Sequence, residues 1–193
     1  MWQDKVSNFN PTDYEKTFTY YESKDGTMVP LTYFHRKDLE INTETPIFLY
    51  GYGGYNISIR PSFSRKYVGW LELGGVVAIA NLRGGGELGK KWHNAGRLKE
   101  KQNVFDDFLY ASKYLEANNI GNRKSTVISG RSNGGLLVGT SLVQNPNYFG
   151  ATLPLDLFVL VFLGLSAAIK SLISKPLSRT NLRNFSAAAW ARL

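Results

Sequence analysis

The sequence predicts an α/β fold, built on a mostly parallel sheet with helices on both faces and preceded by an N-terminal β-hairpin. From residue 46 onward, short apolar runs alternate with runs of helical period, and strands that alternate with helices build parallel sheets. Before that point, two aromatic and β-branched runs within residues 15–36 flank Lys24-Asp25-Gly26-Thr27. Asp-Gly supplies the positive φ of a tight turn, so this segment predicts the hairpin.

Three short runs predict the parallel strands. Residues 46–50 and 124–129 are short apolar or β-branched segments, and residues 74–81 show no polar alternation, which is typical of a strand buried on both faces. A short helix is expected to end at residues 70–73. A further helix is expected after the strand at residues 124–129. Asn145-Pro146 is expected to end it, because helical backbone is disfavoured at the residue before a proline.

Another helix is predicted between the strand at residues 74–81 and the strand at residues 124–129. Asn103 is its expected N-cap, and Asp106 and Asp107 would lie in its first turn, where acidic side chains suit the helix dipole. Four apolar residues then fall at helical spacing and predict its buried face: Val104, Phe108, Ala111 and Leu115.

Two glycine-rich segments follow predicted strands. In Gly51-Tyr52-Gly53-Gly54-Tyr55, the glycines allow the backbone to turn sharply and to approach another part of the molecule. The second segment, residues 83–89, lacks the ending of a phosphate-binding P-loop and the spacing of a dinucleotide fingerprint. We therefore expect an ordered loop there, with no cofactor.

Length and composition indicate a globular protein with a substantial core. The chain has 193 residues, of which 43% are hydrophobic, and no cysteine, so it forms no disulfide and offers no thiol chemistry. No metal site is expected. The N-terminus lacks an apolar segment behind a basic start, which argues against a secretory signal and favours a cytoplasmic location.

The net charge of +8 does not predict nucleic-acid binding. Residues 155–193 contribute +4, from five basic residues and Asp156, and the first 154 residues contribute the other +4, from 18 basic and 14 acidic residues. In the body of the chain the charges are interleaved, as in Lys99-Glu100-Lys101 and beside Asp106-Asp107. Such interleaving is typical of a solvated face.

Gly130-Arg131-Ser132-Asn133-Gly134 has the form of a nucleophile elbow. It follows a β-branched run and leads into an apolar helical run, so Ser132 is predicted at the apex of a sharp turn between strand and helix. Gly130 and Gly134 have a steric reason, because a Cβ at either position would collide with the neighbouring strand or helix. A serine needs a base to take its proton, so the motif requires a histidine and a carboxylate from elsewhere.

Four segments, in order and in register, resemble the catalytic domain of the prolyl oligopeptidase family. They are residues 49–58, residues 81–89 with Trp92-His93, residues 101–108 and residues 130–137, and the match extends from about Val6 to Pro154. The resemblance implies an α/β-hydrolase domain that cleaves short proline-containing peptides after proline, with a β-propeller upstream as a size filter. It also implies that no cofactor takes part.

The resemblance assigns roles to four residues. Ser132 is the nucleophile, and the oxyanion donors are the backbone N–H of Asn133 and the hydroxyl of Tyr52. Tyr55 stands where the family usually has a phenylalanine that lines the substrate cleft. Arg131 occupies a position at which the family commonly has glycine.

The remaining catalytic residues are not found after the elbow. In α/β hydrolases the order along the chain is serine, acid, histidine, but the 61 residues after Ser132 contain one acid, Asp156, and no histidine. Asp156 follows too soon to be the expected triad acid. His35 and His93 precede the serine; we expect His93 to form a structural hydrogen bond and His35 to be a strand or surface residue.

We therefore expect residues 1–154 to be the N-terminal part of a peptidase domain and residues 155–193 to be a divergent tail, in a truncated and inactive chain. One alternative is an α/β-hydrolase esterase or lipase. Another is a non-catalytic chain that binds a partner or a membrane through residues 153–173. Membrane association is not favoured, because the run of 13 uncharged residues at 157–169 is shorter than the roughly 20 that span a bilayer. The sequence leaves the oligomeric state open.

Overall fold

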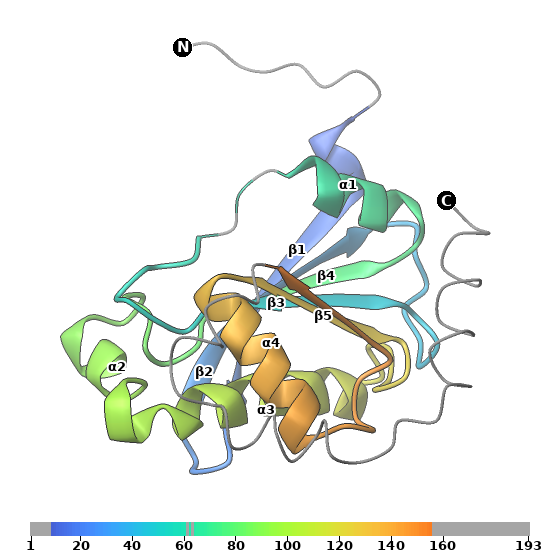
Figure 1. Ribbon diagram of the computed structural model, residues 1–193. Helices are drawn as coiled ribbons and strands as arrows, with labels where there is room; N and C mark the ends of the chain where they lie inside the picture. The colour runs from blue at the N-terminus through green and yellow to red at the C-terminus, as the bar shows by residue number, and fades with distance from the viewer. Residues whose placement is uncertain (1–8, 61, 63, 156–193) are drawn as a thin grey trace, which may run out of the picture. The chain divides into compact units, whose positions relative to one another are not determined.

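The computed structural model describes residues 9–60, 62 and 64–155, which lie in a unit that runs from Met1 to Leu157 (Figure 1). The strands are β1 (Tyr14–Glu22), β2 (Met28–Arg36), β3 (Ile47–Gly51), β4 (Val76–Ala80), β5 (Thr126–Arg131) and β6 (Ala151–Leu155). The α-helices are α1 (Arg65–Glu72), α2 (Lys90–Asn94), α3 (Gln102–Ala117) and α4 (Asn133–Gln144), with short 3-10 turns at Pro11–Asp13 and Leu98–Glu100.

The six strands form one mixed sheet in the order β1-β2-β4-β3-β5-β6. Strands β4, β3, β5 and β6 are parallel, whereas β1 and β2 are antiparallel to each other and β2 is antiparallel to β4. Ile47 in β3 lies opposite Val76 on one side and Thr126 on the other. The α/β class, the mostly parallel sheet and the N-terminal hairpin are thus confirmed.

The hairpin turns where Asp-Gly predicted it. Gly26 has a φ of 82°, the N–H of Ser23 donates to the carbonyl of Thr27 at 2.8 Å, and the N–H of Thr27 donates to a carboxylate oxygen of Asp25 at 3.2 Å. The left-handed conformation at Gly26 is readily adopted by glycine, which has no Cβ. The turn therefore places the Asp25 side chain within hydrogen-bonding reach of Arg83, just after β4.

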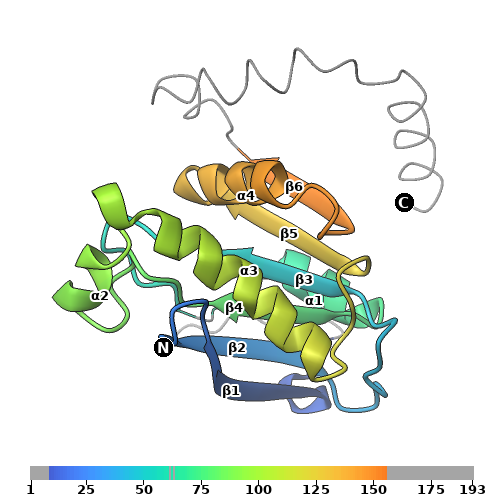
Figure 2. The same cartoon turned by 90° about the horizontal axis from the view of Figure 1, so that it is seen from below.

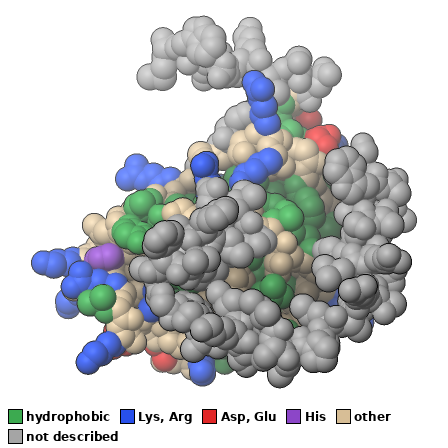
Figure 3. All heavy atoms as spheres, viewed as in Figure 1, with side chains coloured by type: hydrophobic (Ala, Val, Ile, Leu, Met, Phe, Trp, Pro, Cys, Tyr) green, Lys and Arg blue, Asp and Glu red, His purple; other side chains and the backbone are tan. Residues whose placement is uncertain are grey.

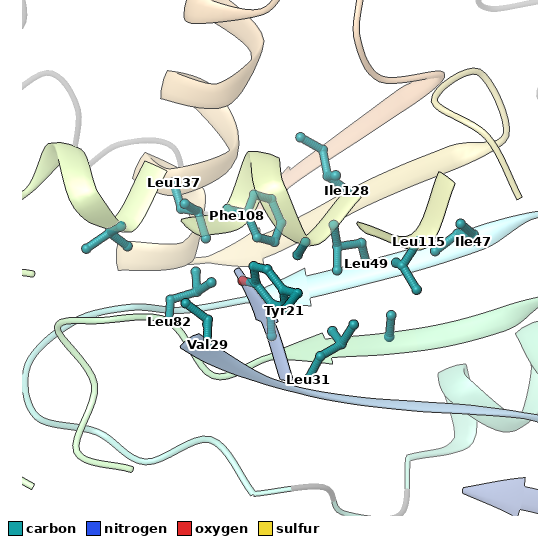
Figure 4. Packing of buried hydrophobic residues seen from close by; sticks show 14 of the residues in the cluster. Tyr21, Val29, Leu31, Ile47, Leu49, Leu82, Phe108, Leu115, Ile128 and Leu137 are labelled. Atoms are coloured by element: carbon teal, nitrogen blue, oxygen red, sulfur yellow. The ribbon is translucent and has the colours of Figure 1, made fainter. Parts of the chain in front are cut away.

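Helices cover both faces of the sheet, as expected. Figure 2 shows α3 and α4 on one face and α1 on the other. The larger core lies under α3 and α4, where Phe108 points between Leu137 and Leu49 (Figure 4). On the opposite face a smaller core joins Leu71 of α1 to residues of β3 and β4, namely Phe48 and Val77.

Helix α3 begins one residue before the expected cap. Gln102 is its first residue, and the side chain of Asn103 donates to the carbonyl of Ala95 at 2.9 Å instead of capping the helix. The expectation for Asn103 was wrong because its side chain joins α3 to the preceding loop. Asp106 and Asp107 consequently lie beyond the first turn. The four apolar positions predicted for the buried face are all fully buried: Val104, Phe108, Ala111 and Leu115.

Asp107 corrects the expectation of a solvated charged face. Its side chain is fully buried, and that of Arg83, just after β4, is 4% exposed. The Arg83 guanidinium donates to both Asp107 carboxylate oxygens through Nε, at 3.1 and 3.0 Å, and the Ser23 hydroxyl donates to Oδ1 at 2.6 Å. A sequence pattern of adjacent acids does not reveal which one points inward, because burial depends on what packs against the helix.

The same arginine also reaches the hairpin turn. Its Nη2 donates to Asp25 at 3.2 Å. Burial alone would lower the pKa of Arg83, but hydrogen bonds to Asp107 and Asp25 raise it above its usual range. The Arg83 hydrogen bond in turn lowers the pKa of Asp25 to about 2. The hairpin, the loop after β4 and helix α3 are therefore joined by one charged network.

Two expectations concern parts of the chain that the structure does not describe. The apolar run at 157–169 and the proposed tail at 155–193 lie outside the described residues, apart from Leu155. Within residues 9–60, 62 and 64–155, no helix has the length and apolar character needed to cross a bilayer. Nor does this part of the chain bring together three metal-ligating side chains.

Replacing Arg83 by Met should destabilise the protein by about 3–5 kcal/mol, because it leaves the Asp107 carboxylate buried without its counter-charge. Lys24→Met is the matched control: Lys24 lies 3.5 Å from Asp106, and its side chain is 61% exposed, so its loss should cost under about 1 kcal/mol. Denaturant unfolding of both variants measures the difference. Equal stability of the two variants would contradict the role of the buried pair.

Candidate active site

Ser132 stands between the end of β5 and the start of α4, as the motif predicted. Its φ is 56° and its ψ is −114°, and it directly precedes Asn133, the first residue of α4. A non-glycine residue in such a conformation costs on the order of 1–3 kcal/mol and persists only where its surroundings hold it. Ser132 is exposed, so the strained turn lies at the surface of the described part of the chain.

The glycines of the elbow are required for close packing. A Cβ on Gly130 would lie 2.2 Å from the carbonyl oxygen of Gly134, and one on Gly134 would lie 3.0 Å from the carbonyl oxygen of Gly51. The first is a collision with α4, and the second is a tight contact with β3, whose backbone would have to move by a few tenths of an ångström. The steric reason predicted for both glycines is therefore present in the structure.

The loop that carries Tyr52 lies against the elbow. Strands β3 and β5 are parallel neighbours, with Tyr50 opposite Ser129, so their carboxyl ends meet at one edge of the sheet. The Asn133 side chain donates to the carbonyl oxygen of Tyr52. A Cβ on Gly134 would also be 3.8 Å from Cδ2 of Tyr52, which places this ring beside the first turn of α4.

Gly53 and Gly54 make this approach possible. Gly53 has a φ of 58°, and a Cβ there would lie 2.2 Å from a methyl group of Val104 in α3. A Cβ on Gly54 would lie 2.5 Å from the side-chain nitrogen of Asn133. A Cβ at either position would displace a side chain, that of Val104 or that of Asn133, from its place against the loop.

The second glycine-rich segment supports the Tyr52 loop from another side. The N–H of Asn56 donates to the carbonyl of Gly84 at 3.1 Å, and a Cβ on Gly84 would be 2.7 Å from the carbonyl oxygen of Gly53. Glu87 accepts a hydrogen bond from the N–H of Ile59 at 2.8 Å. Residues 83–89 therefore form the expected ordered loop, and we call it the platform because its backbone and the Glu87 side chain support residues 53–59.

Tyr55 lies on the same loop, three residues after Tyr52. Its φ is 54° and it is 70% exposed, so its ring has little contact with the rest of the described chain. The next residue, Asn56, also has a positive φ, of 57°. Two consecutive left-handed residues present the tyrosine ring outward at the edge of the sheet that carries Ser132.

Lys101 is a component of the site that the sequence did not predict. Its Nζ donates to the carbonyl of Gly53 at 2.7 Å and to the side-chain oxygen of Asn133 at 3.4 Å. Burial lowers the pKa of Lys101 to about 8. The interleaved charges at residues 99–101 had indicated a solvated face, and this was wrong for Lys101, since the Tyr52 loop covers it.

Neither histidine is hydrogen-bonded to Ser132 within the described residues. Nδ1 of His93 donates to the carbonyl of Gly84 at 2.7 Å, and Nδ1 of His35, in β2, donates to the carbonyl of Arg36 at 2.8 Å. His93 thus has the structural hydrogen bond that we expected. Among the described residues, the Ser132 hydroxyl has no hydrogen-bond partner within 3.5 Å.

Comparison with known proteins identifies the family. The profile of the prolyl oligopeptidase family matches residues 61–163, just over half of the chain. The chain belongs to the prolyl oligopeptidase family. The prolyl endopeptidase of Elizabethkingia meningoseptica is 43% identical over 154 residues, which are 80% of this chain and 22% of that protein.

Solved structures of the prolyl oligopeptidase family share this fold. A prolyl endopeptidase structure that is 50% identical superposes with a TM-score of 0.74, covering 75% of this chain and 21% of the other. Prolyl oligopeptidase B from Galerina marginata is 41% identical and has a TM-score of 0.75, over 78% of this chain and 22% of its own. The chain thus spans about a fifth of the length of these relatives, and the described sheet is part of an α/β-hydrolase domain.

Gly130→Ala should destabilise the protein by about 1–3 kcal/mol or more, because the new methyl group overlaps the backbone of α4. Gly69→Ala is the matched control. Gly69 lies within α1, and a Cβ there would have nothing within 4 Å, so the substitution should stabilise the protein by roughly 0.5–1 kcal/mol. Opposite signs in thermal or denaturant unfolding are expected; a neutral Gly130→Ala would argue against the tight elbow.

Proposed function

We propose that Ser132 is the nucleophile of a serine peptidase that hydrolyses short peptides after proline. The observation that carries this proposal is the joining of the strained Ser132 turn to the Tyr52 loop through the Asn133 side chain. This joining supports the proposal that the Ser132 hydroxyl acts beside two groups able to stabilise negative charge. Acyl transfer by an activated serine needs such a combination.

The proposed donors of the oxyanion hole are the backbone N–H of Asn133 and the hydroxyl of Tyr52. The first N–H groups of a helix have no partner within the helix, and Asn133 is the first residue of α4. When Ser132 attacks the substrate carbonyl, the carbonyl oxygen becomes an oxyanion that these two groups would receive. Each such donor contributes about 2.7–4 kcal/mol, since the charge develops only in the transition state.

The oxyanion intermediate then collapses: the C–N bond after proline breaks, and the amine product leaves with the proton that a base took from Ser132. Water hydrolyses the resulting acyl-enzyme, which releases the acid product and the free serine. Tyr55 is proposed to line the substrate cleft, and its 70% exposure leaves its ring available for contact with a peptide. No cofactor or metal takes part in this proposal.

Peptide substrates are supported by the names and structures of relatives. The Elizabethkingia meningoseptica and Dictyostelium discoideum relatives are prolyl endopeptidases. Galerina marginata prolyl oligopeptidase B has been solved with 25-residue and 35-residue substrates, in mutants that replace a serine, an aspartate or a histidine by alanine. For this chain we infer short proline-containing peptides as the substrate class.

We further propose that the 193-residue chain by itself turns over substrate very slowly. The chain has two histidines, and neither is hydrogen-bonded to Ser132 within the described residues. General bases contribute about 10²–10⁴-fold to such reactions. The oxyanion donors would still provide part of the catalysis, because residual acceleration survives the loss of triad members.

Chemical rescue tests the proposal. With a proline-linked p-nitroanilide peptide, added imidazole should raise the rate of hydrolysis by replacing the missing base, and Ser132→Ala should abolish the imidazole-dependent rate. Tyr52→Phe should lower it by about 10²–10³-fold, as expected for loss of one oxyanion donor. Tyr20→Phe, at an exposed ring of β1, is the matched control and should leave the rate unchanged.

The same assay separates the peptidase from an esterase or lipase. If Ser132 shows imidazole-dependent hydrolysis of an acyl ester but does not hydrolyse the prolyl anilide, the result would support an esterase and overturn the proposed peptidase. The sequence Gly51-Tyr52-Gly53-Gly54 differs from the HGGG-type oxyanion loop that lipases and esterases often use. We therefore expect the prolyl substrate to be preferred. An imidazole-dependent rate that persists in Ser132→Ala would overturn the proposal.

A further inference from the structure

Lys101 contacts both segments that carry the proposed oxyanion donors, the Tyr52 loop and the start of α4. It is the N-terminal flanking residue of α3. Its Nζ donates to the Gly53 carbonyl at 2.7 Å and lies 3.4 Å from the side-chain oxygen of Asn133. Cationic side chains gather over α2 and the turn after it (Figure 3), and Lys99, two residues earlier, is exposed. Lys101 instead points under the loop.

These contacts complete a chain of hydrogen bonds across the site. Asn133 donates to the carbonyl oxygen of Tyr52 through its nitrogen and accepts from Lys101 through its oxygen. Lys101 also holds the next carbonyl, that of Gly53, whose φ of 58° turns the backbone sharply. Two consecutive carbonyls of the loop thus accept hydrogen bonds from side chains at the starts of α3 and α4. Without these donors, both carbonyls would lose their partners at a covered position.

We propose that Lys101 is a positioning residue, which fixes the Tyr52 loop against the nucleophile elbow and so sets the separation between the Tyr52 hydroxyl and the Asn133 N–H. This inference rests on the proposed function of those two groups. Lys101 acts through the loop and Asn133, because within the described residues its Nζ has no hydrogen-bonding contact with Ser132. It is therefore not a base for the serine.

The protonation of Lys101 gives the proposal a measurable signature. Burial lowers its pKa to about 8, which means that the folded protein disfavours the ammonium form. The neutral amine still has two N–H groups for its two acceptors. Other ionisable groups on the adjoining segments include Tyr52 and Tyr55 on the loop, Lys99 and Glu100 beside Lys101, Asp106 and Asp107 in α3, and Arg131 at the end of β5; the first turn of α4 has none.

The sign of the pH effect follows from this shift. Between about pH 8 and the ordinary lysine pKa of about 10.4, the unfolded chain binds more protons than the folded one. Lys101 therefore makes the free energy of unfolding rise with pH in this window. Lys101→Met should remove that rise, and Lys99→Met should keep it.

The decisive experiment is amide hydrogen exchange in the 193-residue chain without substrate. The amides of Asn56 and Ile57 are hydrogen-bonded within the loop structure, to the carbonyls of Gly84 and Gly54. Lys101→Met should lower their protection factors by about tenfold or more, since local opening sets exchange in such loops. Lys99→Met should leave them unchanged. Unchanged protection in Lys101→Met would overturn the proposal.

A second measurement begins with the wild-type chain. The ¹⁵N shift of Gly54 reports on the peptide bond that contains the Gly53 carbonyl, so in the wild-type chain it should titrate with a midpoint near the Lys101 pKa of about 8. The step should persist in Ser132→Ala and vanish in Lys101→Met. A wild-type shift that does not change between about pH 7 and 9.5, or a step that survives in Lys101→Met, would overturn the role of Lys101.

The two measurements separate this inference from the proposed function. Neither uses substrate or turnover, so an inactive chain in the imidazole assay would leave the loop measurements valid. Conversely, an active chain whose loop is insensitive to Lys101→Met would retain the peptidase and lose only the positioning residue.

Discussion

The architecture of the site depends on the buried ion pair between Arg83 and Asp107. An unpaired charge at either position would be expensive to bury, so the segments that carry them must fold together. The pair thereby fixes α3 to the loop after β4, and Asp25 adds the hairpin turn to the same network. Because α3 is held there, its first residues meet the Tyr52 loop: Val104 touches Gly53, and Lys101 binds the Gly53 carbonyl.

Close backbone packing is the second constraint. The elbow, the Tyr52 loop and the platform at residues 83–89 approach one another so closely that a Cβ at Gly130, Gly53 or Gly84 would overlap a neighbour. This density explains how the strained conformation of Ser132 is maintained, since the surrounding backbone leaves the turn no room to relax. Local strain and glycine packing are thus two aspects of the same local structure.

Stabilising an oxyanion and activating a serine have different structural requirements. The proposed donors come from a helix start and a loop, which β3 and β5 place at one edge of the sheet. Activation requires a base at the serine, and neither histidine is hydrogen-bonded to Ser132 within the described residues. In the proposed mechanism, neighbouring parallel strands and their glycines meet the first requirement. The second depends on a further side chain reaching the same edge.

The sequence by itself determined the α/β class, the hairpin, the elbow at Ser132 and the family, because these depend on local patterns: alternating strands and helices, Asp-Gly, and glycines at fixed spacing. The roles of Ser132, Tyr52, Asn133 and Tyr55 remain predictions. Only the tertiary structure decided that Asp107 and Lys101 point inward, that Asn103 joins a loop instead of capping α3, and that residues 83–89 support the Tyr52 loop. Burial and hydrogen-bond partners come from distant segments, and a charged residue in a local pattern looks the same whether solvent or another part of the chain covers it.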